Sequence, residues 1–320
     1  MVTTTDSGTT GAALTSHARR AGRRPAPTHI KDPLVDRVFM VGVYILLTTF
    51  LLAVLLPLLN ILASSFSDPL AVSSGRVSFW PVGFTLEGYS RTLGDSAILR
   101  GFMNSLIYTV VGTALSLALT VALAYPLSRL DFWGRRGIIL AVIFTMLFAG
   151  GLIPTYLVVQ NLGLLDTRWA LILPQAVGVW QVIIAMAFFR SSIPDELYEA
   201  AQLDGSSDLR FLGSVVLPLS KPLLAVVALM YAIAQWNSYF DALLYLRDSD
   251  LYPLQLVLRN ILILNQGSPG MDAAVMMERQ RMADLLKYSL IVISTVPIML
   301  VYPFVARYFS KGIMIGAVKG

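Results

Sequence analysis

The sequence predicts an all-α integral membrane protein, and two observations carry that prediction. Hydrophobic residues make up 56% of the 320-residue chain and charged residues only 13%, against about 25% charged residues in a typical soluble domain. The apolar residues also come in long blocks and are not spread evenly along the chain. A bilayer suits both features, because helices that face lipid need no charged surface.

Six apolar segments are long enough to cross about 30 Å of hydrocarbon, which takes about 20 helical residues. They run over Val38–Leu62, Asn104–Leu127, Gly137–Gln160, Trp169–Phe189, Pro222–Leu246 and Leu285–Phe309. Several of them contain proline, which a membrane bundle tolerates because neighbouring helices and waters satisfy the freed carbonyls. The sequence therefore predicts six transmembrane helices within a membrane domain over residues 37–320.

The first 36 residues are polar and low in complexity, which predicts a disordered N-terminal tail. The apolar run that follows has about 25 residues, longer than the 7–15 residues of a signal-peptide core. We therefore expect the first apolar segment to be retained as a membrane span.

The distribution of lysine and arginine predicts the orientation of the chain in the membrane. With the N-terminus inside, fifteen of the 24 basic residues fall in inside segments, and the bias is strongest beside the first span. Arg279, Arg281 and Lys287 fall outside and weaken the bias. We expect a multi-pass protein of the cell membrane with both termini in the cytoplasm, including a C-terminal tail over about residues 310–320.

The inside loop over residues 190–218 carries the signals of a short, capped helix. Pro194 suits a first helical turn, and the two acidic residues after it oppose the helix dipole favourably. Gly205 can adopt the left-handed conformation that ends a helix. Three small or apolar residues share one shallow face, namely Leu197, Ala200 and Ala201. We expect a rigid helix that the backbone of another protein can approach closely.

This loop resembles the EAA loop of binding-protein-dependent ABC importers, whose pattern is E-A-A-x3-G-x9-I-x-L-P. The fixed residues match at the expected spacing, except that Val215 stands in place of isoleucine. The resemblance implies the type I ABC importer permease fold, in which this loop forms a coupling helix that sits in a cleft of the ATPase. By resemblance, the coupling residues are Glu199, Ala200, Ala201, Asp204, Gly205, Leu217 and Pro218.

Three further segments resemble sugar permeases related to the second permease subunit of the maltose system. They are Gly150–Tyr156 with the turn Leu162–Asp166, the segment Trp236–Asp241, and the ending Tyr302–Gly320, which is similar to an oligosaccharide and uronide branch. The resemblance implies a sugar or oligosaccharide as the transported solute. An importer of another solute, such as a peptide or polyamine, stays open as an alternative.

The resemblance also implies the partners of the chain. One permease of this type forms half of a pathway, so we expect a second homologous permease, two copies of a cytoplasmic ABC ATPase and an extracytoplasmic solute-binding protein. The chain has no G-x4-G-K-[ST] phosphate loop and no recognisable catalytic set, so ATP hydrolysis is expected on the separate subunit and this chain is not expected to be an enzyme. An ion-driven transporter is disfavoured, because most of the predicted spans contain almost no acidic residue or histidine.

No cofactor, metal or nucleic acid is expected to bind. The chain has no cysteine, its two histidines (His17 and His29) lie in the polar tail without a carboxylate cluster, and no basic stripe is interleaved with aromatic residues. The net charge of +5 is better explained by membrane topology.

Polar and aromatic residues in the fifth apolar segment are candidates for a substrate pathway, because polar groups deep in a span are costly and often functional. The candidates are Gln235, Trp236, Asn237, Tyr239 and Asp241. The aromatic faces would suit the C–H surfaces of a sugar, although the same aromatic residues could belong to an interfacial belt. Asn104 and Gln160 are expected to be ordinary caps or interface groups.

Two long outer loops, Ala63–Met103 and Arg247–Asp284, could dock a soluble partner or serve as simple connectors. Within the second, Met271–Leu286 is predicted as a short amphipathic helix on the outer surface.

Overall fold

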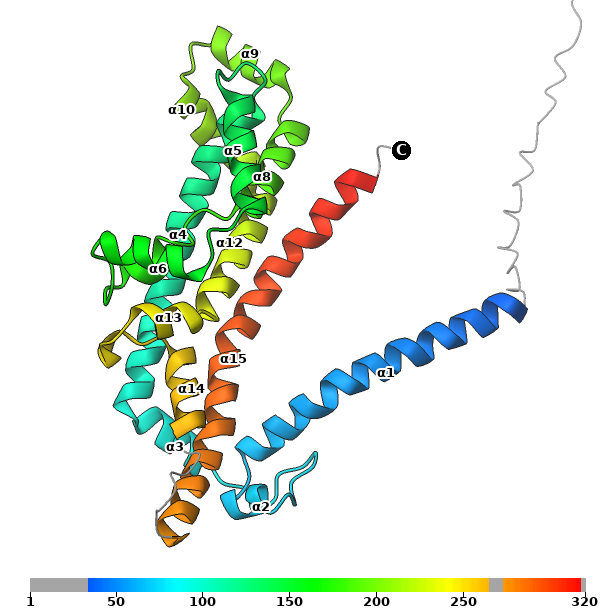
Figure 1. Cartoon of the computed structure of the whole chain (residues 1–320). Helices are drawn as coiled ribbons and strands as arrows, with labels where there is room; N and C mark the ends of the chain where they lie inside the picture. The colour runs from blue at the N-terminus through cyan, green and yellow to red at the C-terminus, as the bar shows by residue number, and fades with distance from the viewer. Residues whose placement is uncertain (1–33, 265–272, 318–320) are drawn as a thin grey trace, which may run out of the picture. The chain divides into compact units, whose positions relative to one another are not determined.

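The computed structural model describes residues 34–264 and 273–317, and all regular elements within these residues are helical (Figure 1). By its internal contacts the chain forms two units, Met1–Val54 and Leu55–Gly320. The predicted disordered tail lies outside the described residues, apart from its last three residues, which begin the first helix.

Helix α1 (Leu34–Ser65) contributes to both units and confirms the first predicted apolar segment as one helix. Its side chains are apolar on all sides and exposed along most of its length, and burial begins only at Ala63. A helix that is hydrophobic all round is suited to lipid. In the second unit, Asn60 donates hydrogen bonds to the carbonyl oxygens of Val77 (3.1 Å) and Ser78 (2.9 Å), which holds the following loop against the end of α1.

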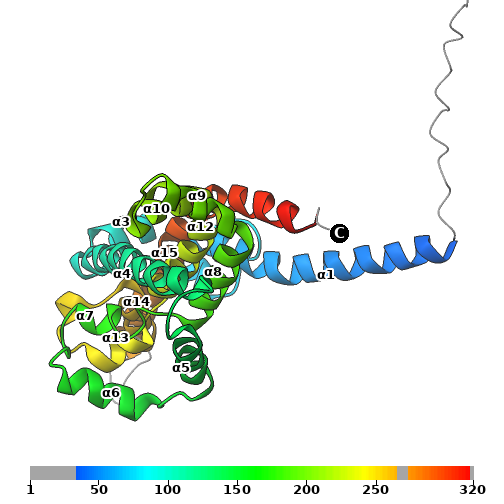
Figure 2. The ribbon, with the colours of Figure 1, turned by 90° about the horizontal axis from the view of Figure 1, so that it is seen from above.

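The second unit is built around α4 (Ser96–Ser128), which packs against α8 (Val179–Ser192) and α12 (Lys221–Trp236), while α12 packs in turn against α15 (Ala273–Ala317) (Figures 1 and 2). Helices α4 and α12 approach closely at Gly112, where an added Cβ would lie 2.9 Å from the Cδ of Gln235. Asp95 caps α4 by accepting hydrogen bonds from the amides of Ala97 (2.8 Å) and Ile98 (3.3 Å).

The largest buried cluster joins these helices to the segment that leads into α12. Its members are Val121, Ala124, Tyr125, Val182, Ala185, Phe189, Ile193, Phe211, Val216, Leu223, Val227 and Tyr231. A second buried cluster lies nearer the other end of α4 and includes residues of α7 (Trp169–Ile172) and α13 (Phe240–Tyr245).

Three of the six predicted spans are not single helices. The segment Gly137–Gln160 is divided into α5 (Arg135–Leu147) and α6 (Leu152–Asn161), which are bent by 117°. Gly151, at φ +87° in the break, adopts a backbone conformation that suits glycine. Figure 1 shows α6 lying across the direction of α4.

The other two interrupted segments are each divided into two helices as well. Trp169–Phe189 is divided into α7 and α8, and Pro174, which has no amide hydrogen to donate, lies between them. Pro222–Leu246 is divided into α12 and α13, with a break at residues 237–239.

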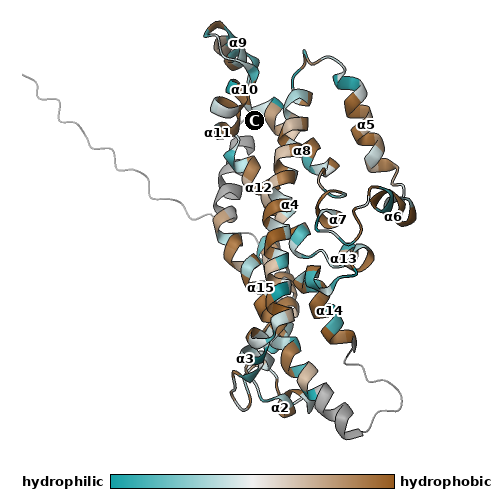
Figure 3. Ribbon diagram, turned by 90° about the vertical axis from the view of Figure 1, so that its left-hand side faces the viewer, coloured by the Kyte–Doolittle hydropathy of each residue, from teal (hydrophilic) through white to brown (hydrophobic). Residues whose placement is uncertain are grey.

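Among the described residues, three helices are long and apolar enough to cross a membrane: α1, α4 and the Arg281–Phe304 part of α15. The number rises to five if each of two bent pairs is one span. Hydrophobic residues predominate on α4 and α5 (Figure 3). The structure therefore supports a membrane protein, whereas a count of six spans stays a prediction.

Four short helices lie toward the two ends of the bundle. Helices α9 (Asp195–Leu203) and α10 (Asp208–Phe211) lie at one end, and α2 (Pro69–Ser73) and α3 (Glu87–Gly94) lie at the other (Figure 1). Between α13 and α15 come the 3-10 helix η2 (Ser249–Leu251) and α14 (Leu254–Leu264). The prediction of a separate surface helix at Met271–Leu286 is wrong, because α15 runs without interruption from Ala273 through that region.

Candidate functional site

Helix α9 is the short, capped helix that the sequence predicts. It begins at Asp195 directly after Pro194 and carries two acidic residues in its first turn. Gly205 has φ +74°, and the amide of Ser206 donates to the carbonyl oxygen of Ala201 at 2.9 Å. This left-handed residue ends the helix and pairs carbonyl groups that would otherwise be unsatisfied. The amide of Asp204 pairs with the carbonyl oxygen of Ala200 at 3.1 Å.

The two faces of α9 differ in their surroundings. Tyr198 and Ala201 are partly buried against the largest core cluster. Side chains at the positions i, i+3, i+4 and i+7 of the opposite face are exposed, namely Glu196, Glu199, Ala200 and Leu203. The apolar face predicted from the sequence is therefore divided, because Ala201 packs inward and Ala200 faces outward.

The segment after α9 forms an elbow that leads into α12. Helix α10 is followed by the π-helix η1 (Leu212–Val216) and the short α11 (Leu217–Leu219). Ser207 caps α10 by accepting a hydrogen bond from the amide of Arg210 at 3.4 Å. The helices before and after Ser220 are bent by 83°. Leu217 and Pro218 of the EAA pattern thus lie at the bend, beside a π-helix, a feature that often marks functional sites.

Arg129, the residue that follows α4, contacts α9 in two ways. Its Nη1 lies 3.1 Å from the Oδ1 of Asp195, and its guanidinium carbon lies 4.2 Å from the ring centroid of Tyr198. The hydroxyl of Tyr198 in turn donates to the Oδ1 of Asp208 at 2.7 Å. That hydrogen bond, together with partial burial, raises the pKa of Tyr198. In the sequence, Arg129 is one of the fifteen basic residues assigned to inside segments, and no local pattern pointed to these contacts.

Two of the five pathway candidates are buried between helices. Trp236 donates its Nε1 hydrogen to the carbonyl oxygen of Ser294 at 3.0 Å and meets Phe102 edge-on at 5.7 Å. Gln235 is buried against Gly112. These two side chains join α12 to α15 and α4.

The other three candidates lie at the break between α12 and α13. Asn237 ends α12 and donates to the carbonyl oxygen of Ile233 at 2.8 Å. Tyr239 is exposed, and Asp241 is half-buried and accepts a hydrogen bond from Gln175. The structure therefore places three of the candidates near one another at an accessible break in the helix.

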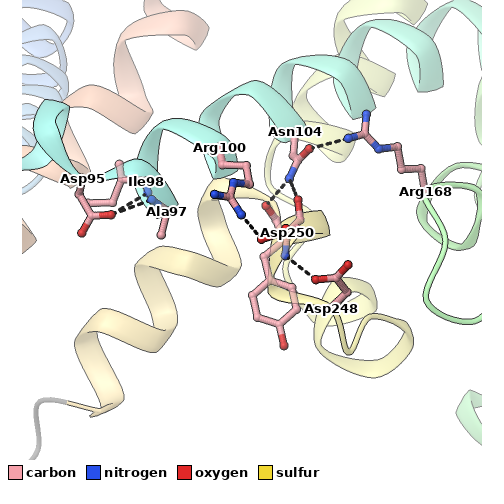
Figure 4. Close-up of polar contacts among 9 residues, drawn as sticks. Asp95, Ala97, Ile98, Arg100, Asn104, Arg168, Asp248 and Asp250 are labelled. Atoms are coloured by element: carbon pink, nitrogen blue, oxygen red, sulfur yellow. Dashed lines mark hydrogen bonds and ion pairs between the residues drawn. The ribbon is translucent and has the colours of Figure 1, made fainter.

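A polar cluster that the sequence did not identify ties η2 to α4 (Figure 4). Asn104 is buried and donates to the carbonyl oxygens of Asp250 (2.7 Å) and Tyr252 (3.2 Å), while its Oδ1 accepts from Arg168 (3.1 Å). Arg100 forms an ion pair with the carboxylate of Asp250. Asn104 is thus a link between distant segments and not an ordinary cap.

Asp166 ties a second pair of segments together. It adopts φ 60°, and its Oδ1 accepts hydrogen bonds from the amides of Arg247 and Asp248, both at 2.8 Å. These backbone hydrogen bonds, first that of Asp248 and then that of Arg247, lower the pKa of Asp166. The sequence had singled out this turn only by resemblance.

Among the described residues, no group of three or more histidine, cysteine, aspartate or glutamate side chains could hold a metal ion. His17 and His29 lie outside the described residues.

No family model matches the chain. The chain is 41% identical over 285 residues to the polygalacturonan/rhamnogalacturonan transport system permease protein YtcP of Bacillus subtilis (strain 168), covering 89% of this chain and 99% of YtcP. It is also similar to a chain in the crystal structure of a bacterial ABC transporter involved in the import of the acidic polysaccharide alginate. That match has a TM-score of 0.81 and 35% identity, and covers 88% of this chain and 99% of the other.

A chain of a bacterial alginate ABC transporter in complex with alginate pentasaccharide-bound periplasmic protein has a similar fold. Its TM-score is 0.51 at 13% identity, covering 85% of this chain and 94% of the other. On the strength of the two closer similarities, the chain belongs to the family of ABC transporter permease subunits whose members serve polysaccharide and oligosaccharide uptake.

Proposed function

We propose that the chain is one of two permease subunits of an ATP-driven importer that moves an acidic oligosaccharide into the cytoplasm. The observation that carries this proposal is the similarity over nearly the whole chain to two transport proteins that are named for polymers of acidic sugars, polygalacturonan and alginate. Uronate oligosaccharides are the chemistry that these two polymers share.

Energy enters through α9, which would dock in a cleft of the ATPase. Its outward face combines two acidic residues with the small side chain of Ala200, and a small residue allows a partner's backbone to come close. Two acidic residues in its first turn and the left-handed Gly205 after its last turn favour a short, stiff helix. We assign the docking and transmission roles to the coupling residues named from the EAA pattern, with Leu217 and Pro218 passing the movement to α12 at the bend.

The assembly would contain a second homologous permease, two ATPase subunits and an extracytoplasmic binding protein. The membrane topology would have six spans, with both termini in the cytoplasm. The binding-protein partner is supported by the similar fold of a transporter that carries a periplasmic protein in its complex. The long apolar exposure of α1 supports contact with lipid or with another membrane subunit.

Within the pathway, we assign contact with the sugar to the accessible break between α12 and α13. Asn237, Tyr239 and Asp241 offer an amide, an aromatic face and a carboxylate there, with Gln175 beside the carboxylate. Gln235 and Trp236 would hold the break in place from the buried side.

Uptake in cells tests the proposal. A strain that lacks this chain is complemented with the wild type, and uptake of labelled trigalacturonate is compared with uptake of neutral maltotriose. We expect uptake of trigalacturonate that depends on ATP and persists when a protonophore collapses the ion gradient. Uptake of maltotriose alone would contradict the substrate class, and uptake abolished by the protonophore with ATP intact would favour a secondary transporter.

The pathway assignment is tested in the same strain. Tyr239→Ala and Asn237→Ala should lower trigalacturonate uptake, whereas the exposed Tyr302→Ala on α15 serves as a matched control. Equal uptake in all three variants, at equal amounts of protein in the membrane, would remove the break from the pathway.

A further inference from the structure

Arg129 occupies an unusual place at the end of α4. Its backbone leaves the helix in an extended conformation (φ −77°, ψ 137°), and its side chain is 13% exposed. It lies between two cavities of about 260 and 350 Å³, each of which it lines. A guanidinium group in such a place needs partners, because burying an unpaired charge is costly.

The partners of Arg129 come from α9. The ion pair with Asp195 and the contact with the face of Tyr198 fall on positions i and i+3 of that helix, so one side chain holds two successive points of α9. The two contacts use different properties of the guanidinium group, its charge and its flat face.

Tyr198 extends the connection beyond α9. Its ring meets Phe211 edge-on at 5.4 Å, and its hydroxyl donates a hydrogen bond to Asp208, so this one side chain contacts the first and last residues of α10. Phe211 is fully buried in the largest core cluster. A continuous path of contacts therefore runs from the end of α4 through Arg129 and Tyr198 to the elbow that leads into α12.

The chain already connects α9 to α8 on one side and to α10 on the other. Its connection to α4 is tertiary, since Arg129 and Asp195 are far apart in sequence. Helix α4 packs on both α8 and α12 at the centre of the second unit. If a contact makes α4 follow α9, then α4, α8 and α12 can move together as one rigid body.

We propose that Arg129 is a positioning residue that fastens α9 to α4, so that a displacement of α9 by the ATPase carries α4 with it. This inference rests on the proposed coupling function of α9. A lysine at position 129 would keep the charge but lose the flat guanidinium face, so Arg129→Lys should have an intermediate effect. Arg129→Met removes the charge and keeps an unbranched side chain.

The test uses the absence of cysteine in the chain. Spin labels are placed at Gln202→Cys on α9, which is exposed but is not one of the four outward-face positions, and at the exposed Val111→Cys on α4, in the complex with its ATPase and partner permease. The distance between the labels is measured with and without ATP. In the wild-type background we expect the distance to stay constant while the ATPase closes. With Arg129→Met we expect ATP to change it, because α9 then moves without α4.

Arg190→Met is the matched control, since Arg190 lines the same cavity as Arg129 but is exposed. Asp195→Asn is a second test variant, because the exposed side chain of Asp195 can lose its charge without disturbing a core. The proposal would be overturned if the distance between the labels stays as constant in Arg129→Met and Asp195→Asn as it does in Arg190→Met. It would also be overturned if the distance in the wild type changes with ATP.

A separate measurement distinguishes failure of the proposed coupling function of α9 from failure of the positioning role of Arg129. A crosslink from Ala200→Cys to the ATPase reports whether α9 docks there. If the crosslink forms and the Arg129 variants behave like Arg190→Met, the positioning role is wrong and the coupling function stands. If the assembled wild-type complex gives no crosslink, the coupling function is wrong and the role of Arg129 falls with it.

Discussion

Gly205 offers a clean perturbation of α9, because its substitution changes the backbone and nothing else. Its φ is +74°, and a Cβ added there would meet no atom within 4 Å. The cost of Gly205→Ala is therefore conformational, about 1–2 kcal/mol for an L-residue in the left-handed region. Since about 1.4 kcal/mol corresponds to a factor of ten in an equilibrium constant, the end of α9 should open about five- to thirtyfold more often.

Hydrogen exchange of the α9 amides in the purified, membrane-reconstituted protein measures this opening. Gly205→Asn should exchange more slowly than Gly205→Ala, because asparagine tolerates the left-handed conformation better. Gly137→Ala is the matched control: it also meets no atom within 4 Å but lies in α5, where alanine stabilises a helix by about 0.5–1 kcal/mol relative to glycine. Unchanged exchange in Gly205→Ala would refute the idea that this glycine sets the end of α9.

Three further predictions concern the frame that holds the site. Tyr231→Phe removes a buried hydroxyl that accepts a hydrogen bond from the amide of Gly178 at 3.0 Å. The substitution should lower the free energy of unfolding by about 1–3 kcal/mol, measured as a lower midpoint of thermal unfolding in detergent. The exposed Tyr302→Phe should leave that midpoint unchanged. Gly112→Leu should weaken the packing of α4 on α12 and lower the same midpoint, because even a Cβ there meets a buried glutamine at 2.9 Å. Because the pKa of Asp166 is lowered in the folded protein, its carboxylate stabilises the fold fully above its ordinary pKa, and this stabilisation is lost as the pH falls through the lowered value. The difference in unfolding midpoint between wild type and Asp166→Asn should therefore be constant from pH 7 to 5 and shrink only below about pH 4.

Each of these predictions has a result that would contradict it. Equal midpoints for Tyr231→Phe and Tyr302→Phe would mean that the buried hydroxyl contributes no stability. A Gly112→Leu variant as stable as the wild type would mean that α4 and α12 are not closely packed there. A difference for Asp166→Asn that vanishes already at pH 6 would mean that another group titrates.

Local features of the site could be predicted from the sequence because they are made within a few residues. The start of α9 after Pro194 and its end at Gly205 depend on neighbouring backbone groups, so residue types at fixed offsets were enough. The long uninterrupted helices α1 and α4 followed from apolar length alone. The coupling and pathway roles of these residues stay predictions.

What the sequence could not supply depends on contacts between distant segments. Hydropathy counts apolar residues without regard to backbone direction, so the breaks that divide three of the predicted spans did not register. Asn104 meets Asp250 across 146 positions of sequence, and Trp236 meets Ser294 across 58. No local pattern distinguishes a buried linking residue from a pathway residue, and Arg129 escaped notice for the same reason.

A cysteine crosslink between α9 and the ATPase tests the coupling proposal most directly. Ala200 is the position to use, because it is exposed on the outward face of α9, whereas Ala201 packs toward the core. The native chain has no cysteine, so Ala200→Cys is a single probe. We expect it to crosslink to cysteines around the docking cleft of the ATPase, with a yield that changes when ATP binds. The absence of any crosslink in a fully assembled complex would contradict the coupling role of α9.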